Sequence, residues 1–209
     1  GIKEGEVYKR STLEKVKSEL VRSYASNGRY GANVEIIEIS KPRNRLEIDI
    51  EVDEGQSAKI EKIIIIGNEI YTDDELFDAF ELSEGSFFSF LSSNDQYSRE
   101  KLVGDIETLE SYYRDRGYLK FSIESSQISL SRDKKSIFIT YNVNEGEKYT
   151  INDVDVLGEI PFDEEVYSPI IDSLKDQTYS QAQITGIEEF FVNVLGNRGF
   201  AFAEVSGNP

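Results

Sequence analysis

The chain has 209 residues, of which 38% are hydrophobic and 30% charged, a composition typical of globular proteins and too apolar for intrinsic disorder. Its net charge of −17 repels phosphate backbones and anionic lipid headgroups, and therefore argues against nucleic acid as a partner. The absence of cysteine excludes disulfides and thiolate metal sites, and no apolar run approaches the roughly 18 residues that span a membrane.

The first residue, Gly1, is not a natural start, because the sequence holds no methionine. No charged segment followed by an apolar run, the pattern of a secretory signal, comes after it. We therefore expect the chain to have been cut from a longer precursor.

An amphipathic helix is predicted near the N-terminus, where apolar side chains recur every three or four residues. Its apolar face consists of Leu13, Val16, Leu20, Val21 and Tyr24. Ser11 and Glu14 have the spacing of a capping box, which predicts the start of this helix. Two alternating segments follow and predict a hairpin, and a change of parity between Ile36 and Ile37 predicts a β-bulge in its first strand.

A second group of elements begins with a β-branched run, Ile60 and residues 63–66, which predicts a strand buried on both faces. The turn Gly67-Asn68 ends this strand. Thr72 and Glu75 form a capping box ahead of a short helix. A longer helix follows and ends at Gly117, and its apolar stripe is formed by Leu102, Ile106, Leu109 and Tyr113.

The segment after this helix predicts a hairpin with an irregular first strand. Phe121 and Ile123 alternate with polar residues, but the alternation resumes at Ile128 with the opposite parity. A β-bulge between Glu124 and Gln127 accounts for the extra residue, and because bulges favour sheet edges, we expect an edge strand. Residues 137–143 then alternate strictly and complete the hairpin.

Several features recur with a period of about 90 residues, which indicates repeated modules. They are the tyrosine-led helices 8–30, 97–118 and 179–200, and the strand ends Val52-Asp53-Glu54-Gly55 and Val143-Asn144-Glu145-Gly146. The middle copy reads strand, helix, helix, strand, strand, and predicts an α+β fold in which two helices cover a three-stranded mixed sheet. We predict a partial module at 1–56 without its first strand and helix, a complete module at 57–148, and a partial module at 149–209 without its last strand.

Clustered acidic side chains are expected to be solvated or to lie at helix N-termini. These are Asp73-Asp74-Glu75, Asp153 with Asp155, and Asp163-Glu164-Glu165. No stretch has the spaced carboxylates and glycine of a calcium loop, so no metal site is predicted. Paired carboxylates such as Glu107 and Glu110 are the basis of a competing acidic-hydrolase hypothesis. Since histidine and cysteine are absent, we predict no enzyme, no catalytic residue and no cofactor.

A set of short motifs extends over the whole chain: Pro42-Arg43-Asn44-Arg45, Asp105-Ile106-Glu107-Thr108-Leu109, Ser111-Tyr112-Tyr113, Asp115-Arg116-Gly117-Tyr118 and Asn142-Val143-Asn144-Glu145-Gly146. In combination they resemble the POTRA modules of the BamA family, the bacterial outer-membrane β-barrel assembly factors. The aromatic loop Phe87-Phe88-Ser89-Phe90 resembles the long connection of the third module. The chain therefore resembles part of the second module, all of the third and most of the fourth. A related two-partner secretion protein or organelle import channel stays open as an alternative.

This resemblance implies a polypeptide-binding scaffold in the periplasm, attached to the outer membrane through a C-terminal barrel that these residues do not include. The implied partners are unfolded outer-membrane proteins and accessory lipoproteins, with periplasmic chaperones as further candidates. Neither nucleic acid nor a membrane span of its own is implied.

The irregular strand is the candidate partner-binding edge, because an edge presents unpaired amides and carbonyls to an extended chain. Its candidate residues are Phe121, Ser122, Ile123, Glu124, Ser125, Gln127, Ile128, Ser129 and Leu130. Weaker candidates are Phe87, Phe88 and Phe90, which are equally consistent with core aromatics beneath a loop. A bulged edge also has a purely structural interpretation, as a device against aggregation between sheets.

Overall fold

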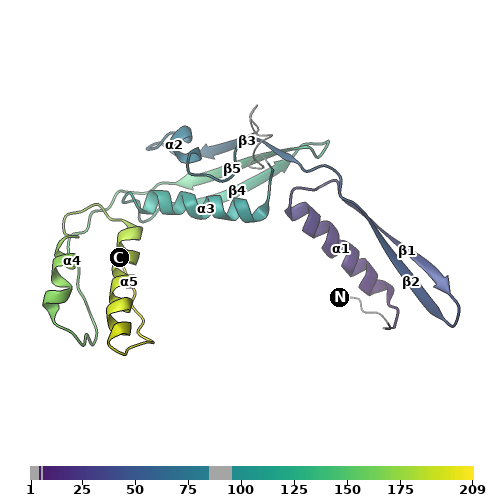
Figure 1. The fold of residues 1–209 in the computed structure, drawn as a ribbon. Coiled ribbons are helices and arrows are strands. Elements are labelled where there is room, and N and C mark those ends of the chain that lie inside the picture. The colour runs from purple at the N-terminus through teal and green to yellow at the C-terminus, as the bar shows by residue number, and fades with distance from the viewer. Residues whose placement is uncertain (1–4, 6, 85–95) are drawn as a thin grey trace. The chain divides into compact units, whose positions relative to one another are not determined.

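The computed structural model describes residues 5, 7–84 and 96–209, and its helices and strands are labelled in Figure 1. The expected α+β class is confirmed. The elements are α1 (Arg10–Ser26), β1 (Asn33–Lys41), β2 (Arg45–Asp53), β3 (Lys59–Ile66), α2 (Asp73–Phe77), α3 (Arg99–Arg114), β4 (Ser122–Leu130), β5 (Ser136–Asn144), the 3-10 helix η3 (Glu164–Val166), α4 (Ser168–Asp172) and α5 (Gln181–Asn197).

The chain divides into two compact units. One contains residues 1–64, 80–105 and 126–141, and the other contains residues 65–79, 106–125 and 142–209. The division passes through strands β3, β4 and β5, whereas the sequence repeat places its boundaries near residues 56 and 148. The three-module division therefore stays a prediction.

Three strands form a mixed sheet in which β5 lies between β3 and β4. The first residues of β3 and β5 meet, since the Lys59 amide donates to the Lys135 carbonyl oxygen over 2.8 Å. Their last residues also meet, because a Cβ atom at Gly67 would overlap the Val143 carbonyl oxygen. β3 and β5 are therefore parallel, and β4 joins β5 as a hairpin.

Strand β3 departs from its predicted burial. The strand forms where expected, but its exposed residues include Glu61, Lys62 and Ile66, so it is not buried on both faces. The reason is its position at an edge of the sheet, where β5 is the one strand of the described residues that pairs with it. Two consecutive exposed residues separate the buried residues Ile60 and Ile63. The alternation of buried and exposed side chains is therefore interrupted once within β3.

The first hairpin does not contain the predicted bulge. Strands β1 and β2 pair without interruption from Asn33 opposite Asp53 to Lys41 opposite Arg45. Since neighbouring residues in an unbroken strand point to opposite faces, Ile37 lies on the face opposite Ile36 and is exposed. The apolar residues of β1 therefore lie on one face of the hairpin up to Ile36 and on the other face from Ile37, and no extra residue is inserted between them.

The two predicted capping boxes have different outcomes. At the start of α2, the Glu75 amide donates to the Thr72 hydroxyl and the Thr72 amide donates to the Glu75 carboxylate, as predicted. At α1 the prediction is wrong, because the helix begins at Arg10 and Lys9 caps it without a side-chain hydrogen bond. The amide of Thr12 already donates to the Lys9 carbonyl oxygen, so the first turn forms ahead of Ser11.

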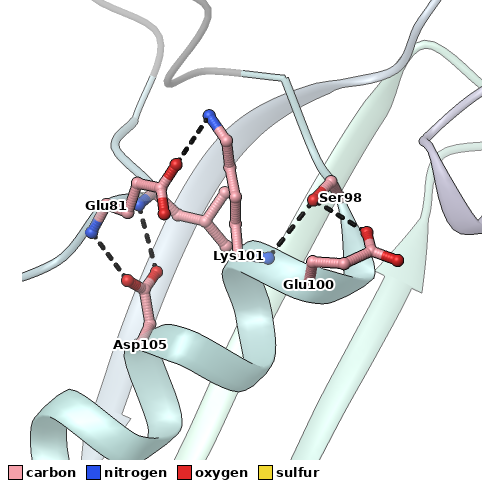
Figure 2. A network of polar contacts seen from close by, with 6 residues as sticks. Glu81, Ser98, Glu100, Lys101 and Asp105 are labelled. Carbon is pink, nitrogen blue, oxygen red and sulfur yellow. Dashed lines mark hydrogen bonds and ion pairs between the residues drawn. The ribbon is translucent and has the colours of Figure 1, made fainter.

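Helix α3 buries the predicted residues Leu102, Leu109 and Tyr113, together with a carboxylate that the apolar stripe does not predict. The Asp105 carboxylate accepts hydrogen bonds from the amides of Glu81 (2.6 Å) and Leu82 (3.1 Å), as Figure 2 shows. Asp105 thereby ties the segment after α2 to the second turn of α3.

A second buried carboxylate, that of Glu145, ties the segment before α2 to α3. It accepts hydrogen bonds from the amides of Glu69 (3.0 Å) and Ile70 (3.1 Å) and from the Tyr113 hydroxyl (2.7 Å). Because each of the two carboxylates satisfies two consecutive backbone donors, both ends of residues 69–82 are anchored without regular pairing.

The recurring strand ends share one turn. The amide of Gly55 donates to the Asp53 side chain, and that of Gly146 donates to the Asn144 side chain, each over 3.1 Å. Both glycines have positive φ, at 64° and 67°, a backbone conformation that other residues rarely adopt. The sequence repeat is therefore a repeat of an Asx turn.

A second recurring contact involves the glycines that follow α1 and α3. The Gly28 carbonyl oxygen accepts from the Ala58 amide, and that of Gly117 accepts from the Tyr149 amide, each over 2.8 Å. Their φ angles are 76° and 102°. A Cβ atom would lie 2.8 Å from the Tyr97 carbonyl oxygen at Gly28, and 2.8 Å from a Thr178 methyl group at Gly117. We call these two contacts the glycine joints.

The last segment forms helices but no strand. Helix α5 begins where Ser180 accepts a hydrogen bond from the Gln183 amide, close to the predicted start. Residues 150–163 contribute only an isolated bridge from Thr150 to Thr178, and residues 201–209 form no strand. Each of these segments lacks a neighbouring strand within residues 149–209, and a strand needs a pairing partner.

Candidate functional site

The candidate edge strand, β4, does lie at an edge of the three-stranded sheet, and β5 is its one neighbouring strand in the part of the chain that the structure describes. All of its residues except Ile123 are exposed, whereas the facing strand β5 alternates between buried and accessible positions. Figure 1 shows β4 as an outer strand of this sheet. Its free side can therefore be reached by another chain.

The pairing of β4 with β5 is set by the connecting turn. The Ser131 amide donates to the Ser136 carbonyl oxygen (2.9 Å), so these residues lie opposite each other. The Asn142 side chain donates to the Ser125 hydroxyl (2.8 Å) at the far end. Both contacts fit one register, because Ser125 and Asn142 each lie six residues from the first pair. The predicted bulge between Glu124 and Gln127 therefore inserts no residue after Ser125.

This register decides which backbone groups of β4 are free. In an antiparallel pair, alternate residues direct both their N–H and C=O groups toward the partner strand. The bonded position of Ser131 assigns the inward groups to Ser125, Gln127 and Ser129. The outward groups belong to Glu124, Ser126, Ile128 and Leu130, and no strand of the described residues pairs with this side of β4.

The structure separates the predicted site residues into three groups. Phe121 precedes the strand, is only 2% exposed, and stacks on Tyr113 with ring centroids 4.1 Å apart, so it belongs to the core. Ser122 and Ile123 open the strand, and the other six predicted residues lie along the edge. Ser126 was missed, because the expected bulge removed it from the alternation. Phe87, Phe88 and Phe90 lie outside the described residues.

The opposite edge of the sheet is partly occupied. The Ile63 amide of β3 donates to the Glu84 carboxylate over 3.0 Å, and Lys59 forms an isolated bridge with Gln96. These contacts use edge groups that an added strand would need. Within the described residues, β4 is therefore the more accessible edge of this sheet.

A polar network surrounds the start of α3 (Figure 2). The Ser98 hydroxyl accepts from the Lys101 amide, and the Lys101 ammonium lies 3.4 Å from the Glu81 carboxylate. Burial raises the pKa of Asp105, while the two amides that donate to this carboxylate oppose the shift. Every contact in this network holds a helix or loop in place, and none directs a free acid toward a cavity.

Glu107 and Glu110, the two carboxylates of the acidic-hydrolase hypothesis, lie on the outer surface of α3. Glu110 pairs with Arg114 over 3.2 Å on the surface of α3, and Glu107 is exposed. The acidic run Asp73-Asp74-Glu75 lies in the first turn of α2, as expected, and Asp163 precedes η3. Among the described residues, no group of three or more acidic side chains is arranged to hold a metal ion.

Within residues 5, 7–84 and 96–209, no helix is both long and apolar enough to cross a bilayer.

Comparison with known proteins gives matches over the whole chain. The model of the POTRA family, described as a surface antigen variable number repeat, matches residues 1–55, 58–146 and 149–209. The outer membrane protein assembly factor BamA of Neisseria meningitidis serogroup B is 28% identical over 212 residues, which cover 100% of this chain and 26% of that protein. The corresponding protein of Buchnera aphidicola is 27% identical, over 89% of this chain and 30% of its own length.

A solved structure has the same fold. The crystal structure of POTRA modules 3–5 of Haemophilus influenzae BamA aligns with a TM-score of 0.54 at 19% identity, covering 98% of this chain and 76% of that one. The chain spans less than a third of the length of the two relatives above.

Proposed function

Because this chain belongs to the POTRA family, we propose that it is a periplasmic scaffold, rather than an enzyme, that binds unfolded outer-membrane proteins during their assembly. The proposal extends to accessory lipoproteins as partners, bound in the same way. In both cases an extended segment of the partner joins the sheet at the free edge of β4. The similarity to outer membrane protein assembly factors supports the biological setting.

The observation that carries this proposal is the unpaired edge of β4. Glu124, Ser126, Ile128 and Leu130 direct their backbone groups away from β5, and all four residues are exposed. Backbone pairing does not depend on the partner's sequence, which suits a scaffold that receives many different chains.

The strength of such binding follows from the number of bonds formed, and a short partner segment that uses half of the eight outward N–H and C=O groups forms four. Four backbone hydrogen bonds at about 0.5–1.5 kcal/mol net each give roughly 2–6 kcal/mol. About 4 kcal/mol corresponds to a millimolar dissociation constant, and ordering the bound segment reduces the gain. A single edge therefore binds weakly and releases its partner readily.

Nuclear magnetic resonance tests the proposal directly. A synthetic peptide copied from one strand of an outer-membrane protein is titrated into the isotope-labelled chain. Amide signals of Glu124, Ser126, Ile128 and Leu130 are expected to shift more than those of residues 137–143, because the edge groups form the new bonds. Equal shifts in both strands would contradict edge pairing.

A matched pair of variants identifies the backbone donor. Ser126→Pro removes an outward N–H group, and an edge position tolerates proline, whereas Ser126→Ala keeps the donor and removes only the hydroxyl. We expect the proline variant to bind the peptide at least about fivefold more weakly, in line with the loss of one bond of about 1 kcal/mol. The alanine variant should bind as the natural chain does. Proline at Ser129 is unsuitable, because that amide points toward β5.

A further inference from the structure

We propose that the outer face of the β1–β2 hairpin is a docking surface for a basic, amphipathic helix of a partner protein. This surface, which we call the hairpin face, consists of Ile37 and Ile39 together with Glu35, Glu47, Asp49 and Glu51. It belongs to another sheet than the β4 edge, so the inference goes beyond the proposed function and does not depend on strand addition.

The pairing of β1 with β2 places these six side chains on one face. Opposite residues of an antiparallel pair share a face, and so do residues two apart along one strand. The opposite pairs are Ile37 with Asp49, Ile39 with Glu47, and Glu35 with Glu51. Each isoleucine therefore lies beside a carboxylate of the neighbouring strand.

The first observation is that the apolar centre of this face is open. Helix α1 packs against β1 on the other face of the hairpin, where Val34 is fully buried (Figure 1). Ile37 and Ile39 point away from that contact and are 39% and 37% exposed. They are two residues apart, which corresponds to roughly 6.6–6.8 Å along the strand. The hairpin thus offers a pair of apolar side chains on the face that α1 leaves uncovered.

The second observation is that the fold does not require charge on this face. The β4–β5 hairpin repeats the β1–β2 hairpin, with Val143 at the position of Val52. Its equivalent face carries only uncharged residues, which are Ser125, Gln127 and Ser129 on β4 and Phe138, Thr140 and Asn142 on β5. The four carboxylates of the hairpin face are therefore additions to a hairpin that also forms without them.

One cross-strand pair makes the difference clear. In the second hairpin, the Asn142 side chain donates to the Ser125 hydroxyl across the two strands over 2.8 Å. The equivalent pair of the first hairpin is Glu51 opposite Glu35. Like charges directly opposite each other destabilise a sheet, whereas a cross-strand hydrogen bond stabilises it. The glutamates are thus kept at a loss of stability, which is expected where they bind a cationic partner.

The charge of the face selects a basic partner. Lys41 forms an ion pair with Glu47 over 2.9 Å. Glu35, Asp49 and Glu51 form no ion pair with any residue that the structure describes. Lysine or arginine side chains of a partner would neutralise these three carboxylates. A second copy of this chain does not fit, because its net charge of −17 repels the face.

The geometry of the face selects a helix. A sheet edge offers backbone groups, but a sheet face offers only side chains, so the partner has to satisfy its own backbone, as a helix does. Apolar residues one turn apart on a helix are about 5.4 Å from each other, close to the spacing of Ile37 and Ile39. Long basic side chains beside these residues would reach the carboxylates while their stems cover the isoleucines.

Two synthetic helical peptides test the surface. Each has about 18 residues, or five turns, with leucines on one side of the helix, and these leucines are flanked by lysines in one peptide and by glutamates in the other. Methyl signals of Ile37 and Ile39 are followed in the isotope-labelled chain. The lysine peptide is expected to shift both signals, and to bind more weakly as salt rises, because salt screens exposed charges. Shifts that are absent, or equal for the two peptides, would overturn the proposal.

Exchanging the glutamate pair separates this surface from the overall charge. The double variant Glu35→Ser, Glu51→Asn introduces the pair of the second hairpin, and is expected to bind the lysine peptide at least about fivefold more weakly. Its urea midpoint should rise, because the repulsion across the strands is removed. The control Glu107→Gln, Glu159→Gln removes two charges from exposed positions elsewhere and should bind within about twofold of the natural chain. Equal weakening in both variants, or an unchanged midpoint in the first, would overturn the proposal.

The apolar pair has its own test. The double variant Ile37→Thr, Ile39→Thr keeps strand-forming side chains and every charge, and should weaken the lysine peptide at least about fivefold, because less apolar surface is buried. Phe138→Thr, at an equally exposed apolar position of the second hairpin, is the control and should leave binding unchanged. If binding survives the loss of both isoleucines, the peptide recognises charge alone and the docking surface is overturned.

Discussion

Two buried tyrosines, Tyr113 and Tyr141, differ in whether their hydroxyl groups have partners. The Tyr113 hydroxyl donates to the Glu145 carboxylate, whereas that of Tyr141 has no hydrogen-bond partner among the described residues. Both side chains are fully buried, and burial raises the pKa of both phenols, so each hydroxyl stays protonated. A buried donor without a partner costs free energy, while a satisfied one stabilises the fold.

Removing each hydroxyl should therefore have opposite effects on stability. Tyr141→Phe is expected to raise the free energy of unfolding by about 1 kcal/mol, and Tyr113→Phe to lower it by roughly 1.5–3 kcal/mol, since its acceptor is a carboxylate. Urea unfolding measures both, and each variant serves as the other's control because the deleted atom is the same. A loss of stability in Tyr141→Phe would mean that this hydroxyl is satisfied.

The pH dependence of stability is expected to report on Asp105. Its pKa is raised in the folded chain, mainly by burial, so the folded state holds the proton more tightly than the unfolded state. The stability that this proton contributes is complete below the unfolded pKa and is lost as pH rises through the folded pKa. The free energy of unfolding of the natural chain relative to Asp105→Asn should therefore fall from about pH 4 to pH 7, because asparagine does not titrate.

Asp133 serves as a control, because its pKa is shifted in the opposite direction to that of Asp105. Hydrogen bonds from the Ser131 hydroxyl and the Lys135 amide lower the pKa of this carboxyl. Its stabilising contribution is present at neutral pH and is lost as pH falls, so the advantage of the natural chain over Asp133→Asn should grow as pH rises. Parallel trends for the two variants in urea unfolding would contradict the assignment to Asp105.

Among the elements, those with local signals were predictable from sequence. The capping box of Thr72, the glycine that ends α3 and the strict alternation of β5 each depend on a few neighbouring residues, and each forms as expected. The edge position of β4 was also predicted. Its register is set by the turn and is unbroken after Ser125.

What sequence could not supply is contact between distant segments. Asp105 lies outside the predicted apolar stripe of α3, yet it is buried because residues 81 and 82 bring two backbone amides to it. Asp115, which directly follows α3, accepts a hydrogen bond from the amide of Ala182 in α5 over 2.7 Å. Neither contact follows from periodicity, because the partners lie 23–24 and 67 residues away. Ser126 was missed for the related reason that its role depends on pairing.

At the scale of the whole molecule, the glycine joints link the ends of α1 and α3 to the start of the segment that follows each. Gly28 and Gly117 both have a positive φ angle, and atoms within 3 Å occupy the space that a Cβ atom would need. Gly28→Ala and Gly117→Ala should each lower the free energy of unfolding by at least about 1 kcal/mol, because the strained backbone and the displaced neighbours both oppose the joint.

The matched control is Gly104→Ala, in the interior of α3, where no atom lies within 4 Å of the added methyl group. That change should raise stability by roughly 0.5–1 kcal/mol, since alanine favours a helix over glycine. Urea unfolding of the three variants also tests cooperativity. The joint variants are expected to give a shallower transition, because neighbouring segments no longer unfold together. An unchanged transition in both would mean that the joints do not transmit stability.

The glycine joints are built from main-chain atoms, with a carbonyl on one side and an amide on the other. Such a connection places almost no demand on the side chains around it, apart from the glycine itself. Gene duplication can therefore lengthen an array of these segments without redesigning each new boundary. After duplication, each copy is free to acquire its own surface, while the same two backbone groups continue to join it to its neighbour.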